Sequence, residues 1–234
     1  MGSIIEMLDE EFSRYLGCRP EDLRTRALTV LASGAAPVMI AVTSAGGVVS
    51  SSLVERSRLM ASVEGCDQSE LFGQPTLRRL TGLLPMRRKP WSVGEVNVLY
   101  FCTRETFRPC AGPAEPVRPD DALWEEAREA EREFAEEGKK WHVEAAFAVY
   151  VGLVRTSTAR LIDQGRHPFR AVGIRTGPEF RRRGYAKACV SAVTAWALER
   201  GLVPLYNTQT CNPASMAVAR AVGYTEYIRY LIVT

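Results

Sequence analysis

Helical and strand-like spacings of apolar residues alternate along the first half of the chain. Over residues 3–16 the apolar side chains recur every three or four residues. This pattern predicts a helix that Ser3 and Glu6 open as a capping box and that Gly17 ends. Residues 23–32 fit either a helix or a strand, and the pattern does not separate the two.

A buried strand is predicted next, at residues 37–43, with Gly46 and Gly47 turning it back into Val48 and Val49 as a hairpin. The remaining elements of this half are expected at three places: helices at 53–63 and 76–84 and a strand at 96–103. The first half therefore looks like a small α/β region.

Residues 104–118 are rich in proline and mark a linker or boundary. We therefore expect an N-terminal α/β region of unassigned function at 1–112 and a second domain at 113–234. Beyond the linker the pattern predicts one charged helix and several strands: a helix at 122–137 and strands at 144–151, 153–162, 169–175, 203–208 and 227–234. Gly152 separates the first two of these strands, which are expected to pair antiparallel.

The stretch 171–198 joins a short strand, a turn, three consecutive arginines and a helix of about four turns. The strand ends at Thr176, and Gly184 stands between the arginines and the helix. The first N–H groups of a helix have no intrahelical acceptor and attract anions, and a glycine lets an anion approach the backbone closely. The stretch therefore predicts a phosphate site. The alternative is a solvated basic turn before an ordinary amphipathic helix. On either interpretation, the predicted wetter side of the helix carries Lys187, Ser191, Thr194 and Leu198.

The arrangement Arg181-x-x-Gly184-x-Ala186, after a strand and a Thr-Gly-Pro-Glu turn, resembles the acyl-CoA pyrophosphate motif of the GNAT superfamily of N-acetyltransferases. A second motif supports this resemblance. Asn212 is a favourable N-cap followed by Pro213 at the first helical position, and Gly223 stands where a helix-ending glycine is expected. The superfamily likewise carries an Asn at the start of this helix and a Gly-aromatic pair after it. The resemblance covers about residues 115–234.

This resemblance implies a mixed α/β (α+β) fold with a mostly antiparallel central sheet flanked by helices. The strand ending at Thr176 and the strand at 203–208 would splay apart, and the pantetheine arm of acetyl-CoA, or of another acyl-CoA, would enter between them. Backbone amides near Ile174 and Thr176 would pair with the arm and orient the thioester carbonyl. The pyrophosphate would be held by the loop amides of Arg181, Arg182, Arg183, Gly184, Tyr185 and Ala186. Asn212 and Ser215 would lie near the arm or the sulfur.

The implied reaction is direct acyl transfer to an amine in a ternary complex, and the chain departs from the superfamily in two places. Ala219 stands where many relatives carry a tyrosine that protonates the departing thiolate. The position where some relatives carry a basic glutamate falls near Arg170, whose guanidinium stays protonated. The general base therefore stays unassigned, with four candidates: Glu144, His142, Glu179 and a water held by Asn207.

The composition sets limits on other functions. A net charge of +3 indicates no strong bias towards nucleic acid or membrane. The six cysteines form no CxxC pair and the chain has only two histidines, which argues against a zinc cluster. We therefore expect reduced thiols, no metal and a cytoplasmic protein. No apolar run approaches the ~20 residues that span a bilayer.

One other function and two secondary sites stay open. The protein could be an inactive acyl-CoA-binding protein of the same fold. A nucleic-acid contact by the arginine run is a third hypothesis, but the near-neutral charge and the lack of aromatic residues interleaved with the arginines argue against it, so no nucleic-acid partner is expected. The acceptor would be a small-molecule amine or a peptide, and a homodimer is compatible with the sequence. Serines 50–52 fit a helix N-cap or a ligand site, and a basic cluster fits a solvated surface or an acidic partner: Arg78, Arg79, Arg87, Arg88 and Lys89.

Overall fold

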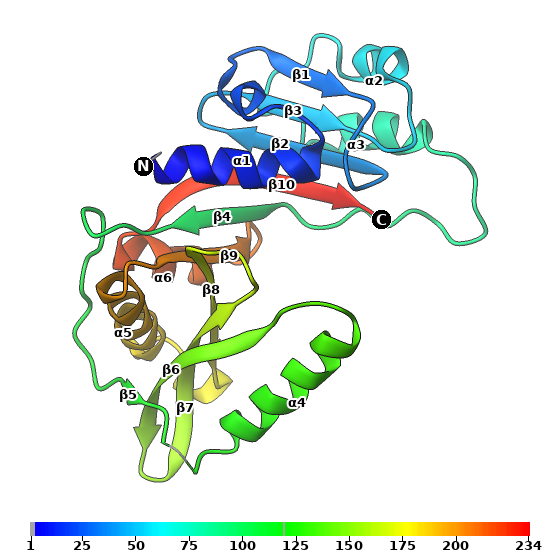
Figure 1. Ribbon diagram of the computed structural model, residues 1–234. Helices are drawn as coiled ribbons and strands as arrows, with labels where there is room; N and C mark the ends of the chain where they lie inside the picture. The colour runs from blue at the N-terminus through cyan, green and yellow to red at the C-terminus, as the bar shows by residue number, and fades with distance from the viewer. Residues whose placement is uncertain (1–2, 119) are drawn as a thin grey trace. The chain divides into compact units, whose positions relative to one another are not determined.

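The computed structural model describes residues 3–118 and 120–234. The chain forms two compact units (Figure 1). Unit 1 contains the residues up to Val98 together with Gln209–Cys211 and Tyr227–Thr234, and unit 2 contains Leu99–Thr208 and Asn212–Glu226. The expected domain boundary after residue 112 stays a prediction. The compact units divide earlier, between Val98 and Leu99, and the end of the chain belongs to unit 1.

Helix α1 (Ile4–Leu16) has the predicted ends. The N–H of Glu6 donates to Ser3 Oγ at 3.2 Å, and the N–H of Ser3 donates to Glu6 Oε2 at 2.6 Å. Gly17 follows in the left-handed region, with φ of 66°. The capping box and the C-terminal glycine are therefore confirmed.

Unit 1 contains a sheet in the order β1-β3-β2-β10. Strands β2 and β3 form the predicted antiparallel hairpin, β10 pairs antiparallel with β2, and β1 lies parallel to β3. Residues 23–32, for which the sequence did not distinguish helix from strand, contain the end of a 3₁₀ turn followed by a strand. The elements of this unit are η1 (Pro20–Arg24), β1 (Leu28–Leu31), β2 (Val38–Thr43), β3 (Gly47–Ser50), α2 (Arg56–Val63), α3 (Gln74–Gly82) and β10 (Thr225–Val233).

The serines at 50–52 do not cap a helix, so that prediction was wrong. Helix α2 begins only at Arg56, with Glu55 as an N-cap that makes no side-chain hydrogen bond. Ser51 Oγ instead accepts hydrogen bonds from the N–H groups of Leu53 and Val54, at 3.1 and 3.0 Å. The hydroxyl therefore stabilises a turn, which satisfies these N–H groups without a helix.

The basic cluster of unit 1 is partly used inside the unit. Arg79 donates from Nε to the carbonyl oxygen of Ser62 at 2.8 Å. Arg87 stacks over the Trp91 ring at 3.5 Å and donates to the carbonyl oxygen of Thr234 at 2.7 Å. The acidic-partner hypothesis for this cluster stays a prediction.

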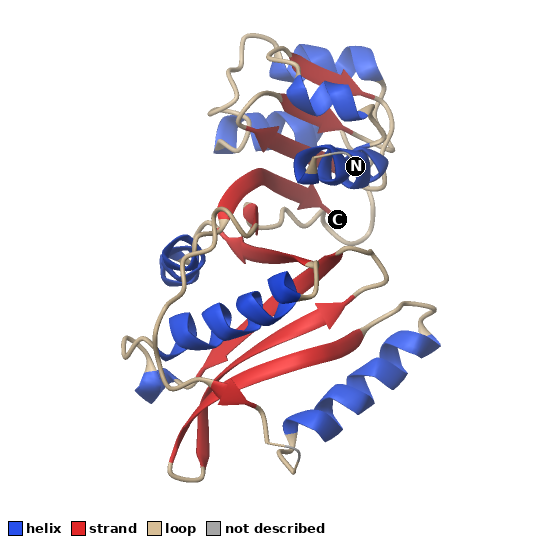
Figure 2. Ribbon diagram, turned by 60° about the vertical axis from the view of Figure 1, so that its left-hand side comes forward, coloured by secondary structure: helices blue, strands red, loops and turns tan. Residues whose placement is uncertain are grey.

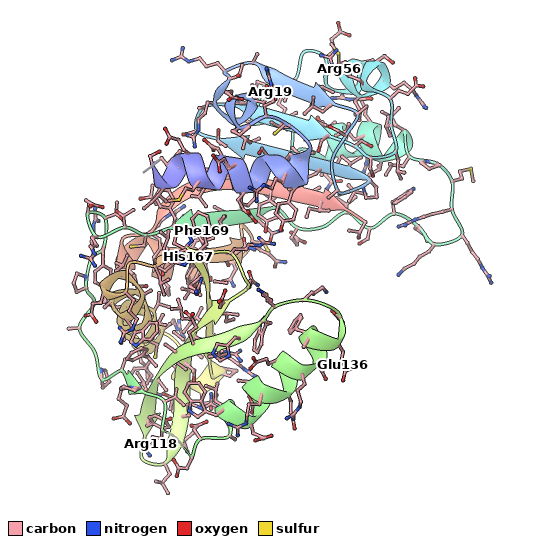
Figure 3. All side chains as sticks on the ribbon, viewed as in Figure 1. Arg19, Arg56, Arg118, Glu136, His167 and Phe169 are labelled. Carbon is pink, nitrogen blue, oxygen red and sulfur yellow. The ribbon has the colours of Figure 1, made fainter. Side chains whose placement is uncertain are left out.

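Unit 2 contains a mostly antiparallel sheet in which helices flank the strands (Figures 1 and 2). Strands β5 to β8 pair antiparallel in chain order, and β9 lies parallel to β8. Phe169, labelled in Figure 3, begins β8. The elements are β4 (Asn97–Phe101), which crosses the division, β5 (Glu115–Pro116), α4 (Leu123–Glu136), β6 (His142–Val151), β7 (Val154–Asp163), β8 (Phe169–Thr176), η2 (Pro178–Phe180), α5 (Tyr185–Glu199), β9 (Val203–Gln209) and α6 (Pro213–Val222). The predicted mixed fold with a largely antiparallel sheet is therefore confirmed.

The two faces of the β6–β8 sheet have different covers. Directly opposed residues in an antiparallel pair share a face, and residues along one strand alternate between faces. On the face that we call the α4 face, Leu123 and Ala127 of α4 pack against Ala146 and Ala148 of β6. The other face, which we call the α5 face, is covered by α5, and this helix contacts β6, β7 and β8. The side chains buried on this face include Ala159, Leu161 and Val172.

The predicted wetter side of α5 is wrong for three of its four residues. Lys187 is exposed, but Ser191, Thr194 and Leu198 are buried. Ser191 Oγ accepts a hydrogen bond from the N–H of Cys110 at 2.9 Å, and Thr194 Oγ1 lies 2.7 Å from the hydroxyl oxygen of Tyr224. These polar partners come from distant parts of the chain and make the burial of Ser191 and Thr194 favourable. The periodicity of the helix alone does not reveal such partners.

Among the described residues, none of the helices combines the length and the apolar character needed to span a bilayer.

Candidate functional site

The loop between β8 and α5 leaves a series of peptide N–H groups without acceptors. The N–H of Arg181, which was expected to belong to the anion site, instead donates to the carbonyl oxygen of Pro178 at 3.3 Å, so that part of the prediction was wrong. Within the described residues, the N–H groups from Arg182 to Lys187 have no hydrogen-bond partner, and the next bonded amide is that of Ala188, which donates to the carbonyl oxygen of Gly184 at 3.1 Å. Gly184 is the N-cap of α5, with φ of 81°. Unbonded N–H groups at a helix start are donors of the kind that bind anions.

The backbone of this loop is strained at Arg182. Its φ is 61°, in the left-handed region that non-glycine residues rarely adopt. Such a conformation costs of order 1–3 kcal/mol and is typical of ligand-binding segments. The side chains of Arg181, Arg182 and Arg183 are exposed, and none of them has an acidic partner in the described part of the chain. The strain and the unpaired positive charge therefore occur in the same three residues.

Strands β8 and β9 separate soon after they begin. Their parallel pairing consists of three residue pairs: Phe169 with Val203, Arg170 with Pro204, and Ala171 with Leu205. Beyond this point β8 continues to Thr176 and β9 to Gln209 without pairing to each other. The expected splay between the two strands is present.

The unpaired edge of β8 carries the N–H groups of Ile174 and Thr176. The N–H of Gly177 donates to the carbonyl oxygen of Thr156 on the β7 side, at 3.0 Å. Because N–H directions alternate along a strand, those of residues 174 and 176 point to the opposite edge, towards the side where β9 begins. The N–H of Val203 donates to the carbonyl oxygen of Pro168, which shows that the even-numbered residues of this segment direct their backbone groups towards β9.

Asn212 and Ser215 form the first turn of α6. Asn212 Oδ1 accepts a hydrogen bond from the N–H of Ser215 at 3.1 Å, so the predicted N-cap is confirmed. Gly223 ends the helix in the left-handed region, with φ of 95°. Ser215 Oγ lies 2.8 Å from the hydroxyl oxygen of Tyr206. Ala219, one turn later, is fully buried.

Tyr206 is a functional candidate that the sequence did not indicate. It stands on β9 at the first position after the pairing with β8 ends, and it is buried. Burial raises the pKa of its phenol, and the hydrogen bond with Ser215 opposes this rise. Its ring meets that of Tyr224 edge-on, with centroids 5.6 Å apart. A single tyrosine in a strand carries no motif, and only the fold brings it to Ser215.

Arg170, at the position where some relatives carry a basic glutamate, is the centre of a buried ion-pair cluster. Its guanidinium donates to both oxygens of Glu144, at 2.8 and 3.0 Å, and lies 3.3 Å from Asp163 Oδ2. These contacts raise the pKa of Arg170, chiefly through the hydrogen bonds to Glu144. Glu144 is thus engaged with a fixed cation, which lowers its suitability as a base.

The other candidate bases lie at exposed places. His142 Nδ1 is 3.3 Å from Glu131 Oε2, and both side chains are exposed. Glu179 and Asn207 are exposed as well. The general base therefore stays unassigned.

The structure groups most of the predicted site residues in one continuous segment. Ile174 and Thr176 lie on the open edge of β8, and the residues from Arg181 to Ala186 follow directly in the loop and the first turn of α5. Asn212 and Ser215 come from α6, which contacts α5. Two surface depressions, of about 420 and 370 Å³, lie elsewhere and include none of these residues.

Comparison with known proteins gives one match to a family model and several to structures. Residues 166–233 match the model of the GNAT acetyltransferase family, so the C-terminal part of the chain resembles this superfamily. The match begins just before β8 and covers the loop, α5, β9 and α6. No curated protein matches the chain by sequence.

Several solved structures are similar at low identity. A GNAT-family acetyltransferase from Colwellia psychrerythraea is 14% identical, with 61% of this chain and 56% of that chain covered and a TM-score of 0.46. A GCN5-related N-acetyltransferase from Kribbella flavida is 14% identical, with coverages of 61% and 59% and a TM-score of 0.43. A GCN5-related N-acetyltransferase-like protein from Streptococcus suis is 16% identical, with coverages of 80% and 79% and a TM-score of 0.42. The chain thus spans less than two thirds of the first two of these relatives.

Proposed function

Starting from the resemblance of residues 166–233 to the GNAT acetyltransferases, we propose that the chain is an N-acyltransferase that uses acetyl-CoA as the acyl donor. The observation that supports this best is the run of unbonded N–H groups from Arg182 to Lys187, directly after a strand whose edge is open. An anion-binding turn next to an unpaired strand edge suits a donor that has a diphosphate at one end and amide groups along its arm.

The residues present fit such a donor. The N–H groups from Arg182 to Lys187, with the three arginines around them, would hold the diphosphate. The outward N–H groups of Ile174 and Thr176 would hydrogen-bond the amide-containing arm as a neighbouring strand does. Asn212 and Ser215 would stand at the thioester end, at the start of α6.

Acetyl-CoA supplies an acetyl group activated as a thioester. The acceptor amine forms the new C–N bond while the C–S bond breaks, the amine loses one proton and the thiolate gains one. The start of α6 favours negative charge nearby. The Ser215 hydroxyl, paired with Tyr206, is the proton-bearing group of that turn. Ala219 cannot take this role because it has no ionisable group and is fully buried.

A second function, acyl-CoA binding without catalysis, is favoured by two observations. Glu144 is held by the guanidinium of Arg170 in a bidentate pair, and Ala219 replaces the superfamily tyrosine. Loss of a general acid or base costs roughly 10²–10⁴-fold in rate. Such a loss leaves binding intact.

Thiol release from acetyl-CoA in the presence of a panel of amines tests the proposal. Release that depends on the amine, together with an N-acetylated product detected by mass spectrometry, would support acyl transfer. Tight binding of acetyl-CoA by calorimetry with no product on any amine would favour the binding protein. Absence of binding would overturn both functions.

A further inference from the structure

Two arginines on the α4 face stand beside the open edge of β8. Arg160 of β7 lies directly opposite Gly173 of β8, and Arg175 of β8 lies directly opposite Thr158 of β7. Opposed residues share a face, so these four positions form one block in which the two arginines are diagonal neighbours. Diagonal neighbours are within reach of each other's long side chains. The block belongs to the α4 face because Ala146 of β6 pairs with Arg160.

Neither arginine is neutralised by the protein. Within the described residues, Arg160 and Arg175 have no hydrogen-bond or ion-pair partner. Arg155, which donates to Thr158 from the same side, is already paired with Asp121 at 3.1 Å. Arg160 is half-buried and Arg175 is exposed. Two unpaired guanidinium groups on adjacent strands repel each other, and a shared anion removes this repulsion.

One position of the block carries no side chain. Gly173 has no side chain opposite Arg160, and the nearest atom that a Cβ at Gly173 would meet is Ile162 Cδ1, at 3.8 Å. The glycine therefore places no side chain of its own beside the Arg160 stem. On one side α4 covers β6, and on the other side β8 presents its unpaired edge from Val172 to Thr176.

The opposite face does not allow an acceptor to approach. There α5 buries Ala159, Leu161 and Val172, and Tyr206 is buried in contact with Ser215 of α6. An amine that reaches a thioester lying along the open edge of β8 must therefore approach from the α4 face. On this route it passes Arg160 and Arg175.

We propose that Arg160 and Arg175 bind an anionic group of the acceptor, so that the acceptor is an amine that also carries a carboxylate or a phosphate. This inference rests on the proposed acyl transfer. Guanidinium groups bind planar carboxylates and phosphates through paired, charge-assisted hydrogen bonds. Loss of such bonds corresponds to roughly 10- to 100-fold in affinity.

Matched acceptors provide the test: an amino acid against its amide, and phosphoethanolamine against ethanolamine. We expect wild-type kcat/KM to favour the anionic member of at least one pair by roughly tenfold or more. Arg175→Gln and the double variant Arg160→Gln/Arg175→Gln should remove this preference through KM. Rates with the neutral members should stay within about twofold, since they lack the anion. The pair that shows the effect identifies carboxylate or phosphate.

Arg108→Gln is the control. Arg108 is exposed in unit 2 and has the same charge, and its substitution changes the net charge equally while leaving the sheet face intact. Equal kcat/KM for both members of both pairs, or an equal loss in Arg108→Gln, would overturn the inference. Arg175 is exposed, so its variant is expected to fold even if the half-buried Arg160 does not tolerate substitution.

Calorimetry distinguishes failure of this inference from failure of the proposed function. We expect acetyl-CoA to bind wild type and the double variant equally, because neither arginine belongs to the loop before α5. Normal binding and turnover without an anion preference would overturn only the acceptor assignment. If no amine is turned over, an N-acetyl amino acid titrated into CoA-loaded protein should bind wild type and not the double variant. Equal binding, or none to wild type, would overturn the assignment.

Discussion

The hydroxyl oxygen of Tyr206 lies 2.8 Å from that of Ser215, which links β9 to the first turn of α6. The two partners differ in exposure, since Tyr206 is 1% exposed and Ser215 is half-buried. Water can replace a lost partner at Ser215 but not at Tyr206. The energetic effect of breaking this bond therefore depends on which side is removed.

We predict that Ser215→Ala destabilises the protein more than Tyr206→Phe does. Removal of the serine hydroxyl leaves a buried phenol unsatisfied, at a cost of about 1–3 kcal/mol, whereas removal of the phenol oxygen costs about 1 kcal/mol or less. Urea denaturation measures both free energies of unfolding. The double variant should be more stable than Ser215→Ala alone. Equal losses, or additive ones in the double variant, would show that the bond has no such asymmetry.

Gly184→Asp should abolish acetyl-CoA binding while the fold persists. A carboxylate at this position repels a phosphate held by the loop amides, and no atom lies within 4 Å of a Cβ placed there. Gly184→Asn is the matched control, because it places a similar side chain at the same positive φ without the charge. We expect calorimetry to show at least tenfold weaker binding for Asp than for Asn, by roughly 1.4 kcal/mol or more. Unchanged affinity in Gly184→Asp would remove the loop from the site.

Asp9→Asn should destabilise unit 1 strongly. Asp9 accepts two hydrogen bonds from Arg24, at 2.6 and 2.7 Å, and one from the Tyr227 hydroxyl at 2.8 Å. Breaking a buried pair costs about 3–5 kcal/mol, and we expect about 2–3 kcal/mol here because Arg24 is partly exposed. The control, Glu125→Gln, removes an exposed partner of Arg128 and should leave the urea midpoint unchanged. Similar midpoints for the two variants would contradict this prediction.

Stability should fall above pH 9 in a way that depends on Cys102. Burial raises the pKa of this thiol from 9.0 to about 11. Between these values the unfolded chain loses the proton and the folded chain keeps it, so unfolding is favoured as the pH rises. The slope is up to about 1.4 kcal/mol per pH unit. Urea denaturation from pH 8 to 11 should show a shallower decline in Cys102→Ala than in wild type. Cys211→Ala, at an exposed site, should follow wild type.

Both ends of α1 and of α6 were predictable because their signals are local, whereas the start of α2 was not. Ser3 with Glu6, Gly17, Asn212 and Gly223 each act within one helical turn, and the structure shows every one of these caps. The strands of unit 2 and the splay of β8 and β9 also agreed with expectation, the latter from the resemblance to a known superfamily.

Features that depend on distant contacts were not predictable. Ser191 and Thr194 looked solvent-facing by periodicity, yet Cys110 and Tyr224 come from other segments to bond them. Tyr206 gains its importance only from the place of Ser215 on the next helix. Such pairings depend on tertiary structure, which a one-dimensional pattern of polar and apolar residues does not contain.

The early end of the β8–β9 ladder has a consequence for amide exchange and for ligand-linked folding. The outward N–H groups of Ile174 and Thr176 have no strand partner, so we expect their deuterium uptake to be fast within an otherwise protected strand. An extended molecule bound along this edge slows that uptake and stabilises the native state by about 2.7 kcal/mol at a concentration of 100 Kd. The folded fraction of unit 2 in a cell would therefore vary with the supply of whatever it binds.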